Sequence, residues 1–338
     1  MSKLLGFEKD IKNNNILSIQ MNLLNKCTSK CKSCRKYTWP DNELSFNDIK
    51  TTLTYLKVNG LQTVVFSGGD PILYKDFDKV IDLCNELDIK FSLITTLITN
   101  DMDLLKKIAL NAYRIHVSFD SCFDERYKLI RGVNGCKIAI RNIKYVQRFR
   151  GDKIPVRLSS TMSKMNYMDT IELYAFAKEN NCLINYYFLH TWDDLKMSEN
   201  EIKEFYNYMR IIATDERDCK KVISNAKSII VQEFEFQTVS QHCKQCYLPY
   251  INATIDSNGD IYPCCRLLDD NGCYGEQVEN VYGNIAGKLI TELDKIFVNR
   301  FKKYPLNCKL CHECGDRYNG VLAELEKIID DKREPLFL

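Results

Sequence analysis

The sequence lacks several features that would assign it to a specialised class of protein. No stretch approaches the ~18 consecutive apolar residues of a membrane-spanning helix, and the first residues, MSKLLGFEKD, contain no apolar secretion signal. Neither sign of charge dominates, because 47 lysines and arginines stand against 45 acidic residues, so a polybasic arm for nucleic acid is absent. There is no internal repeat and no low-complexity tract. These absences predict a cytoplasmic protein with neither a membrane nor a nucleic acid as partner.

What is present is the composition of an ordinary globular protein. Hydrophobic residues make up 45% and charged residues 27% of the chain, which excludes intrinsic disorder. The 338 residues are long enough for about two domains and for a sizeable hydrophobic core.

Cysteine is more abundant than this composition would suggest, with 16 residues. Without a secretion signal a disulfide framework is not expected, and clustered thiols in a reducing compartment more often bind metal. One cluster lies in the N-terminal part and a second in the C-terminal part: Cys27, Cys31 and Cys34, then Cys243, Cys246, Cys264, Cys265, Cys273, Cys308, Cys311 and Cys314. The others are scattered between them and are expected to be buried as small hydrophobic residues: Cys84, Cys122, Cys136, Cys182 and Cys219.

Short apolar runs alternate with amphipathic segments through the first 190 residues. The runs are rich in β-branched and aromatic residues and predict six strands, at 16–23, 63–67, 90–96, 114–119, 156–161 and 184–189. Apolar residues at helical spacing predict helices that begin at Ser45, around 77–84, and at 101–110, 136–148, 167–179 and 198–212. Strands that alternate with helices predict a parallel sheet, either doubly wound or curved into a barrel. After residue 240 the pattern changes to short pieces between cysteines, with turn signals at 257–260 and 270–272.

The first cysteine cluster, CTSKCKSC, places Cys27, Cys31 and Cys34 at spacings of four and three just after the first strand. Three thiolates of one loop can bind one face of a cubane cluster. Tetrahedral structural zinc requires four ligands and no fourth cysteine is nearby, so the spacing favours a 4Fe–4S cluster with one open iron. A zinc site with a distant fourth ligand and a coincidental spacing remain as alternatives.

A second motif, Phe66-Ser67-Gly68-Gly69-Asp70-Pro71, ends the second strand. Paired glycines let the backbone approach a ligand closely, and parallel α/β folds bind their ligands at the carboxyl ends of the strands. A three-cysteine loop after the first strand and a Gly-Gly-acid-Pro turn after the second together resemble the radical S-adenosylmethionine (radical SAM) superfamily. The resemblance implies an α/β fold in which residues 1–212 form a partial (β/α)6 TIM-like barrel.

The resemblance also implies which residues bind SAM. In the family a Gly-Gly-Glu-Pro turn holds the methionine amino group with its backbone, and Asp70 is a conservative variant of that glutamate. The candidate cofactor-binding residues are Ser67, Gly68, Gly69, Asp70, Pro71, Thr95, Ser118, Asp120 and Arg131. Solvation or helix capping is the alternative interpretation of the last three.

Two positions depart from the family pattern. The family's third strand commonly ends in Thr-Asn-Gly, and the triplet Thr95-Thr96-Leu97 matches only its first residue. Before the last cluster cysteine the family usually has an aromatic residue that leans on adenine, but Ser33 stands there. Tyr37 or Trp39 could supply that stacking instead.

The C-terminal cysteines resemble the SPASM/twitch extension of radical SAM enzymes, which binds auxiliary 4Fe–4S clusters. The shorter twitch form with one auxiliary cluster fits better, because no cysteine follows Cys314, although eight thiols could supply two clusters. The candidate ligands are Cys246, Cys264, Cys308, Cys311 and Cys314. A zinc ribbon built on the Cys-x2-Cys pairs is the alternative. The predicted boundaries are a barrel over 1–212, a connecting segment over 213–240, the cysteine-rich module over 241–320 and a helix or tail over 321–338.

The resemblance implies an enzyme that cleaves SAM reductively to a 5′-deoxyadenosyl radical, with a flavodoxin- or ferredoxin-type electron donor. The cofactors carry this chemistry, so no acid–base residue is assigned a leading part, and His190 is the one catalytic candidate. Only 26 residues precede Cys27, which is too few for the peptide-recognition domain of many maturases. This favours oxidation or epimerisation of a small substrate such as a sugar or aminocyclitol alcohol. Modification of a ribosomal peptide or protein residue is the alternative, and a non-catalytic iron–sulfur or zinc protein is the alternative of another class.

Overall fold

One curved sheet organises the molecule. The structure, a computed structural model, describes residues 15–34, 40–189, 194–213, 252–263 and 282–299. Six parallel strands lie side by side in chain order: β1 Ser18–Leu24, β2 Thr63–Gly68, β3 Lys90–Thr95, β4 Arg114–Ser118, β5 Arg157–Met162 and β6 Leu183–Phe188. All six predicted strands are therefore confirmed, each to within two residues, because buried runs of β-branched residues between helices are a strong strand signal.

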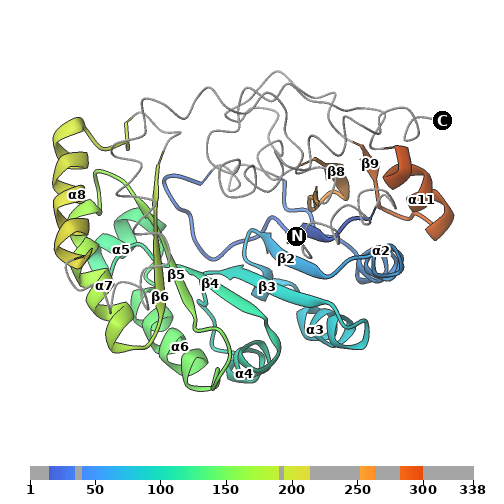
Figure 1. The fold of residues 1–338 in the computed structure, drawn as a ribbon, viewed down its shortest axis with the longest axis horizontal. Helices are drawn as coiled ribbons and strands as arrows, with labels where there is room; N and C mark the ends of the chain where they lie inside the picture. The colour runs from blue at the N-terminus through green and yellow to red at the C-terminus, as the bar shows by residue number, and fades with distance from the viewer. Residues whose placement is uncertain (1–14, 35–39, 190–193, 214–251, 264–281, 300–338) are drawn as a thin grey trace, which may run out of the picture.

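Helices connect these strands and cover the outer side of the curve, as Figure 1 shows for α3, α4, α6 and α7. Their bounds are α2 Phe46–Val58, α3 Phe77–Glu86, α4 Met102–Asn111, α5 Asp124–Arg131, α6 Cys136–Arg148, α7 Thr170–Glu179 and α8 Glu199–Ala213. The predicted helices are confirmed, and the one over 167–179 starts with a 3-10 turn, Tyr167–Asp169. Of these seven helices, only α5 had no sequence prediction of its own.

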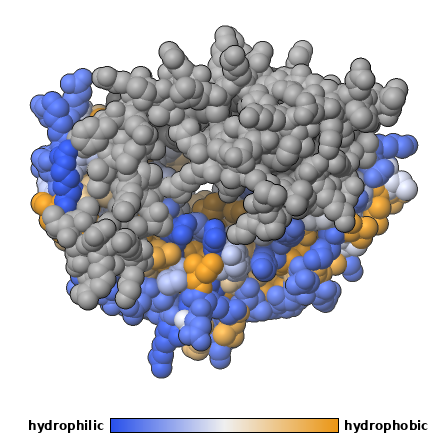
Figure 2. Space-filling model, viewed as in Figure 1, coloured by the Kyte–Doolittle hydropathy of each residue, from blue (hydrophilic) through white to orange (hydrophobic). Residues whose placement is uncertain are grey.

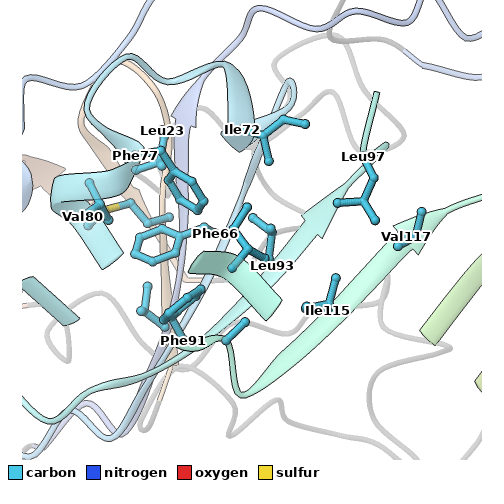
Figure 3. Close-up of a cluster of buried hydrophobic side chains, with 14 of the residues drawn as sticks. Leu23, Phe66, Ile72, Phe77, Val80, Phe91, Leu93, Leu97, Ile115 and Val117 are labelled. Carbon is cyan, nitrogen blue, oxygen red and sulfur yellow. The ribbon is translucent and has the colours of Figure 1, made fainter. Parts of the chain in front are cut away.

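The two faces of the sheet differ sharply in polarity. Alternate strand residues such as Phe66, Leu93 and Val117 are fully buried against the helices. Figure 3 shows Phe66 beside Phe77 of α3, and the two rings meet edge to face with centroids 5.8 Å apart. The other set of strand residues is mostly polar and faces the inside of the curve, which is the pattern of a barrel with a polar interior.

Three further strands extend the sheet on the side of β1. β7 Asn252–Ile255 pairs in parallel with β1, and β8 Asp260–Tyr262 and β9 Gly283–Asn284 follow antiparallel. The predicted turn at 257–260 joins β7 to β8, with Gly259 at φ +89° donating its N–H to the carbonyl of Asp256 at 3.0 Å. Helix α11, Ile290–Asn299, packs on α2, where the rings of Tyr55 and Phe297 stack at 5.7 Å. The described C-terminal strands thus share one sheet with the barrel.

The architecture is a mixed α/β fold with an open, curved parallel sheet, as the sequence predicted for a partial barrel. On the coloured part of the face shown in Figure 2, hydrophilic residues lie with hydrophobic residues between them. Within the described ranges, no helix has both the length and the apolar character needed to cross a bilayer.

Candidate active site

The three-cysteine loop leaves the carboxyl end of β1 and is fastened on two sides by main-chain hydrogen bonds. The N–H groups of Lys30 and Lys32 donate to the last carbonyls of α5, at 2.8 and 3.0 Å. On the other side, the N–H of Asp70 in the turn after β2 donates to the carbonyl of Lys26 at 2.9 Å. The loop that carries Cys27, Cys31 and Cys34 is therefore held between the ends of β2 and α5.

Two of the thiols have donors that favour their deprotonated form. The N–H of Ser29 donates to Cys27 Sγ at 3.4 Å, and Nη1 of Arg131 donates to Cys31 Sγ at 3.6 Å. Burial nevertheless raises the pKa of Cys27 to about 11 and also raises the pKa of Cys31. These thiols keep their protons at neutral pH until a bound metal displaces them.

This donor set fits an iron–sulfur cluster. In the part of the chain that the structure describes, no three His, Cys, Asp or Glu side chains converge around a point as the ligands of one metal ion would. In a cubane each cysteine binds a different iron, so its three ligands surround a cluster instead of one atom. The N–H and guanidinium donors near the sulfurs supply the hydrogen bonds that such thiolates accept.

The Gly-Gly turn packs directly on the backbone of the cysteine loop. Gly68 has φ +122°, and a Cβ added there would lie 2.3 Å from the carbonyl oxygen of Leu24. A Cβ added at Gly69 would lie 2.0 Å from the carbonyl oxygen of Lys26. Neither contact is possible for a side chain, so only glycine fits. The two motifs recognised in the sequence are thus one structural unit.

Asp70 connects this turn to the end of β3. Its carboxylate is completely buried and accepts the hydroxyl of Thr95 at 2.7 Å and the N–H of Thr96 at 3.0 Å, as well as the hydroxyl of Thr96. Burial raises the pKa of Asp70, and the three donors oppose that rise. Both carboxylate oxygens are therefore occupied by donors of the protein itself. The next residue, Pro71, opens a 3-10 turn, Pro71–Leu73.

Leu97 has a backbone conformation that is unfavourable for a residue with a side chain. Its φ is +55°, in the left-handed region, at the position where the family pattern has glycine. Nδ2 of Asn142 in α6 donates to the carbonyls of Leu97 and Thr99, both at 2.7 Å, and the Leu97 side chain is fully buried (Figure 3). The packing of its side chain and the two hydrogen bonds from Asn142 hold the strained residue in place, as is common beside ligand sites.

Asp120 and Arg131, proposed separately from the sequence, form a buried ion pair. Nε of Arg131 lies 2.6 Å from Oδ2 of Asp120, whose Oδ1 accepts the N–H of Thr161 at 2.8 Å. Because Arg131 also contacts Cys31, the pair joins the cysteine loop to the ends of β4 and β5. Ser118 ends β4 on the inner face, beside Ser159 of β5. The sequence predicted these residues individually, but their contacts depend on the fold.

Several predicted site residues lie outside the described residues: His190, Tyr37, Trp39, Cys246, Cys264, Cys308, Cys311 and Cys314. Sequence reasoning missed a second group on the inner face. His116 of β4 is the register partner of Arg157 of β5, and Arg114 lies on the same face. The signal that could have found them is the alternation of polar and apolar residues in RIHVS and RLSSTM.

The environment of His116 gives the protein a pH-dependent stability. Burial, then the charges of Arg157 and Arg114, lower the pKa of His116 from 6.5 to about 4. Between these two values the unfolded chain binds a proton that the folded chain does not, so the free energy of unfolding falls as the pH falls through this window. Above pH 6.5 His116 is mostly neutral in both the folded and the unfolded chain, so it no longer lowers the free energy of unfolding.

We therefore expect the substitution His116→Asn to reduce the pH dependence of stability. From pH 7 to pH 5 the wild type should lose on the order of 2 kcal/mol more than the variant does. Urea unfolding of both proteins at the two pH values measures the difference. Parallel stability curves would contradict the expectation, because other acid-sensitive groups are the same in both chains.

The curved parallel sheet, with three cysteines and a Gly-Gly turn joined at its carboxyl edge, is the arrangement of an enzyme that binds an iron–sulfur cluster and SAM side by side. Residues 21–178 match the family model for the radical SAM superfamily. These residues are therefore a radical SAM domain, and radical SAM enzymes use a 4Fe–4S cluster and SAM.

Relatives extend the similarity beyond the matched region. The protein named "Probable GTP 3',8-cyclase" of Methanocaldococcus jannaschii is 26% identical over 282 residues, covering 78% of this chain and 89% of that protein. The "Fe-coproporphyrin III synthase" of Methanosarcina barkeri is 25% identical over 258 residues, covering 73% of this chain and 60% of that protein. Among solved structures, SuiB of Streptococcus suis bound to the precursor peptide SuiA has a TM-score of 0.67 at 20% identity. That match covers 92% of this chain and 74% of SuiB, and it shows a shared fold.

Proposed function

We propose that this enzyme binds a 4Fe–4S cluster through Cys27, Cys31 and Cys34 and SAM on the adjoining Gly-Gly turn, and that it abstracts hydrogen from a small substrate. When bound and reduced, these cofactors supply a 5′-deoxyadenosyl radical, which can attack an unactivated C–H bond. The observation that carries the proposal is the packing of Gly68 and Gly69 on the backbone of the cysteine loop, which puts the two binding elements in contact.

The protein's own groups would bind and orient these cofactors. The backbone of the turn at Gly68 and Gly69 would hold the methionine end of SAM, next to the iron that has no cysteine ligand. Ser118 would contact SAM from the end of β4, while Asp120 and Arg131 would keep the loop of Cys31 at a fixed distance from that strand. A flavodoxin- or ferredoxin-type protein would supply the electron.

A small substrate is favoured by the names of the two sequence relatives. GTP and coproporphyrin are both small, anionic metabolites, and these relatives align with most of this chain. A sugar or aminocyclitol alcohol, the narrower expectation from the sequence, gains no support from these relatives, so the proposal is kept at the level of a small metabolite. A peptide is the second candidate, because the structural neighbour SuiB was solved with a precursor peptide.

Hydrogen transfer itself can distinguish the two substrate classes. The enzyme would be incubated anaerobically with SAM, a reductant and size-separated fractions of a deuterium-grown cell extract. Abstraction adds one deuterium to 5′-deoxyadenosine, which mass spectrometry detects. We expect deuterium to appear in 5′-deoxyadenosine when the fraction below ~1 kDa is added, which is the size range of drug-like and cofactor-like ligands. Label with the peptide fraction alone would favour the second candidate, and absence of any 5′-deoxyadenosine would overturn the proposal in favour of a non-catalytic protein.

We also propose that the C-terminal cysteines hold an auxiliary 4Fe–4S cluster, with Cys246, Cys264, Cys308 and Cys311 as its ligands and Cys314 as a further candidate. A cluster with four cysteine ligands has no open iron, so its function would be electron transfer.

The double substitution of Cys308 and Cys311 by alanine should separate the two clusters. Iron content should fall by about four per chain, while reductive cleavage of SAM continues and net substrate oxidation stops. Iron analysis, 5′-deoxyadenosine and product are measured on the same samples. Equal loss of cleavage and oxidation would count against an electron-transfer function, and zinc in place of the missing iron would indicate a zinc ribbon.

A further inference from the structure

Arg131 places a positive charge beside a sulfur of the cysteine loop. Its Nη1 donates to Cys31 Sγ at 3.6 Å, whereas the donor to Cys27 Sγ is the uncharged N–H of Ser29. Arg131 is only 8% exposed, so this contact lies away from bulk water, where charges act on one another more strongly. A fixed cation is therefore in contact with one ligand of the proposed cluster.

Asp120 neutralises part of this charge from another edge of the guanidinium. Its Oδ2 lies 2.6 Å from Nε of Arg131, while the sulfur of Cys31 lies at Nη1. The guanidinium contacts the sulfur, and the buried carboxylate contacts the guanidinium. Because a Coulomb interaction weakens with distance, the cation has the larger effect on the sulfur, and the carboxylate reduces that effect.

The main chain of α5 holds the cysteine loop without using the guanidinium. The N–H groups of Lys30 and Lys32 donate to the carbonyls of Arg131 and Ile130, at 2.8 and 3.0 Å. A Cβ added at Gly132 would lie 2.5 Å from the carbonyl oxygen of Lys30, so this helix end is in direct contact with the loop backbone. A substitution of the arginine side chain leaves these main-chain contacts in place, and the contact between guanidinium and sulfur calls for a further function.

A second arginine of α5 forms the same kind of pair without a sulfur. Arg126 pairs with Asp169, whose Oδ2 accepts the hydroxyl of Ser121 at 2.6 Å. The guanidinium carbon of Arg126 also lies 5.7 Å from the ring centroid of Phe123. In the part of the chain that the structure describes, no hydrogen bond joins this pair to the cysteine loop. The pair of Arg126 therefore serves as an internal comparison for the pair of Arg131.

We propose that Arg131 raises the reduction potential of the cluster bound by the cysteine loop, and that Asp120 limits this rise. The inference rests on the proposed function, because it requires that cluster. On reduction the cluster gains one electron from the external donor, and no bond forms or breaks. A cation that donates to a ligand sulfur stabilises the more negative, reduced form, and such hydrogen bonds help to set the potentials of iron–sulfur proteins. The pair thus helps to determine which electron donors can reduce the enzyme.

The test is a redox titration of the cluster-loaded enzyme without SAM or substrate, followed by electron paramagnetic resonance. The relevant cluster is the one whose signal disappears when all three cysteines of the loop are replaced by alanine. At a fixed applied potential, Arg131→Gln should lower the ratio of reduced to oxidised cluster at least tenfold. For one electron this equals a potential lower by about 59 mV. Asp120→Asn should raise the ratio, because the charge of Arg131 is then uncompensated.

Three features of the design isolate the effect of charge. Arg126→Gln is the matched control on the same helix and should titrate like the wild type. Arg131→Lys keeps the charge and should give a potential between those of the wild type and Arg131→Gln. Asp120→Asn keeps an oxygen that can accept the N–H of Thr161, so the substitution removes little besides the negative charge. Because SAM is absent, no shift can arise from altered SAM binding.

The opposite directions of the two shifts distinguish an electrostatic effect from a loosened loop, which would move both potentials the same way. Unchanged potentials in Arg131→Gln and Asp120→Asn, or shifts in the same direction, would overturn the inference. If Arg131→Gln loses its cluster, Asp120→Asn decides alone, and a potential that does not rise overturns the inference. A wild type that binds no iron would instead contradict the proposed function, so the two failures are distinguishable.

Discussion

Replacing Cys27, Cys31 and Cys34 together by alanine should remove one whole 4Fe–4S cluster, about four irons per chain, and with it all cleavage of SAM. In the proposed assignment the loop supplies every protein ligand of that cluster, so the triple variant retains no thiolate there to bind iron. Iron and sulfide analysis after anaerobic reconstitution, together with chromatography of 5′-deoxyadenosine, measures both effects.

Cysteines of the core provide the control. Cys84 in α3 and Cys182 before β6 are buried and far from the loop in sequence, so Cys84→Ala and Cys182→Ala should keep the wild-type iron content. Each should lose only about 1 kcal/mol of stability, because a small cavity replaces one sulfur atom. Full iron content and continued cleavage in the triple variant would refute the assignment of the ligands.

The second large effect is expected from Gly69→Ala. The added Cβ would lie 2.0 Å from the carbonyl oxygen of Lys26 and 2.5 Å from that of Asn25. Both atoms are backbone, so no rotamer change can relieve the overlap, and the cysteine loop must move away from the end of β2. We expect a loss of about 3 kcal/mol in the free energy of unfolding, together with most of the cluster occupancy.

Gly151→Ala is the matched control for this substitution. Gly151 has φ +53° but no neighbouring atom within 4 Å of an added Cβ, so it tests the general cost of alanine in a left-handed conformation. That cost should be about 1 kcal/mol, with iron content unchanged. Thermal unfolding and iron analysis compare the two variants, and the same iron content in Gly69→Ala as in the wild type would contradict the packing argument.

Strong local patterns explain which parts of the fold were predictable. The six strands were predicted because each is a compact apolar run that is followed by a helix with its own period. Helix α5 was missed because its sequence, DERYKLIR, is short and mostly charged, and only Tyr127 and Ile130 mark its buried side. Strands β7, β8 and β9 were missed because four, three and two residues are too few to show a period.

The sequence motifs of the candidate site were predictable, but the contacts between these motifs were not. The spacing of the cysteines and the paired glycines are visible in the sequence, because ligand geometry and close backbone approach constrain residue types directly. The link from Arg131 to Cys31 and the burial of the Asp70 carboxylate against Thr96 depend on which strand ends come together. The inner-face position of Arg157 depends on register, which a single sequence does not state.

The pairing of β1 with β7 also has a consequence for how the enzyme is made. β1 is synthesised before the other strands of the sheet, and its hydrogen-bonding partner on one side, β7, is encoded far downstream, after α8. Until that partner is synthesised, the growing barrel has an open edge beside the cysteine loop, and open edges promote aggregation. The sheet is therefore completed at the edge that carries the cysteine loop, and a nascent chain that stalls after α8 still exposes the open edge of β1.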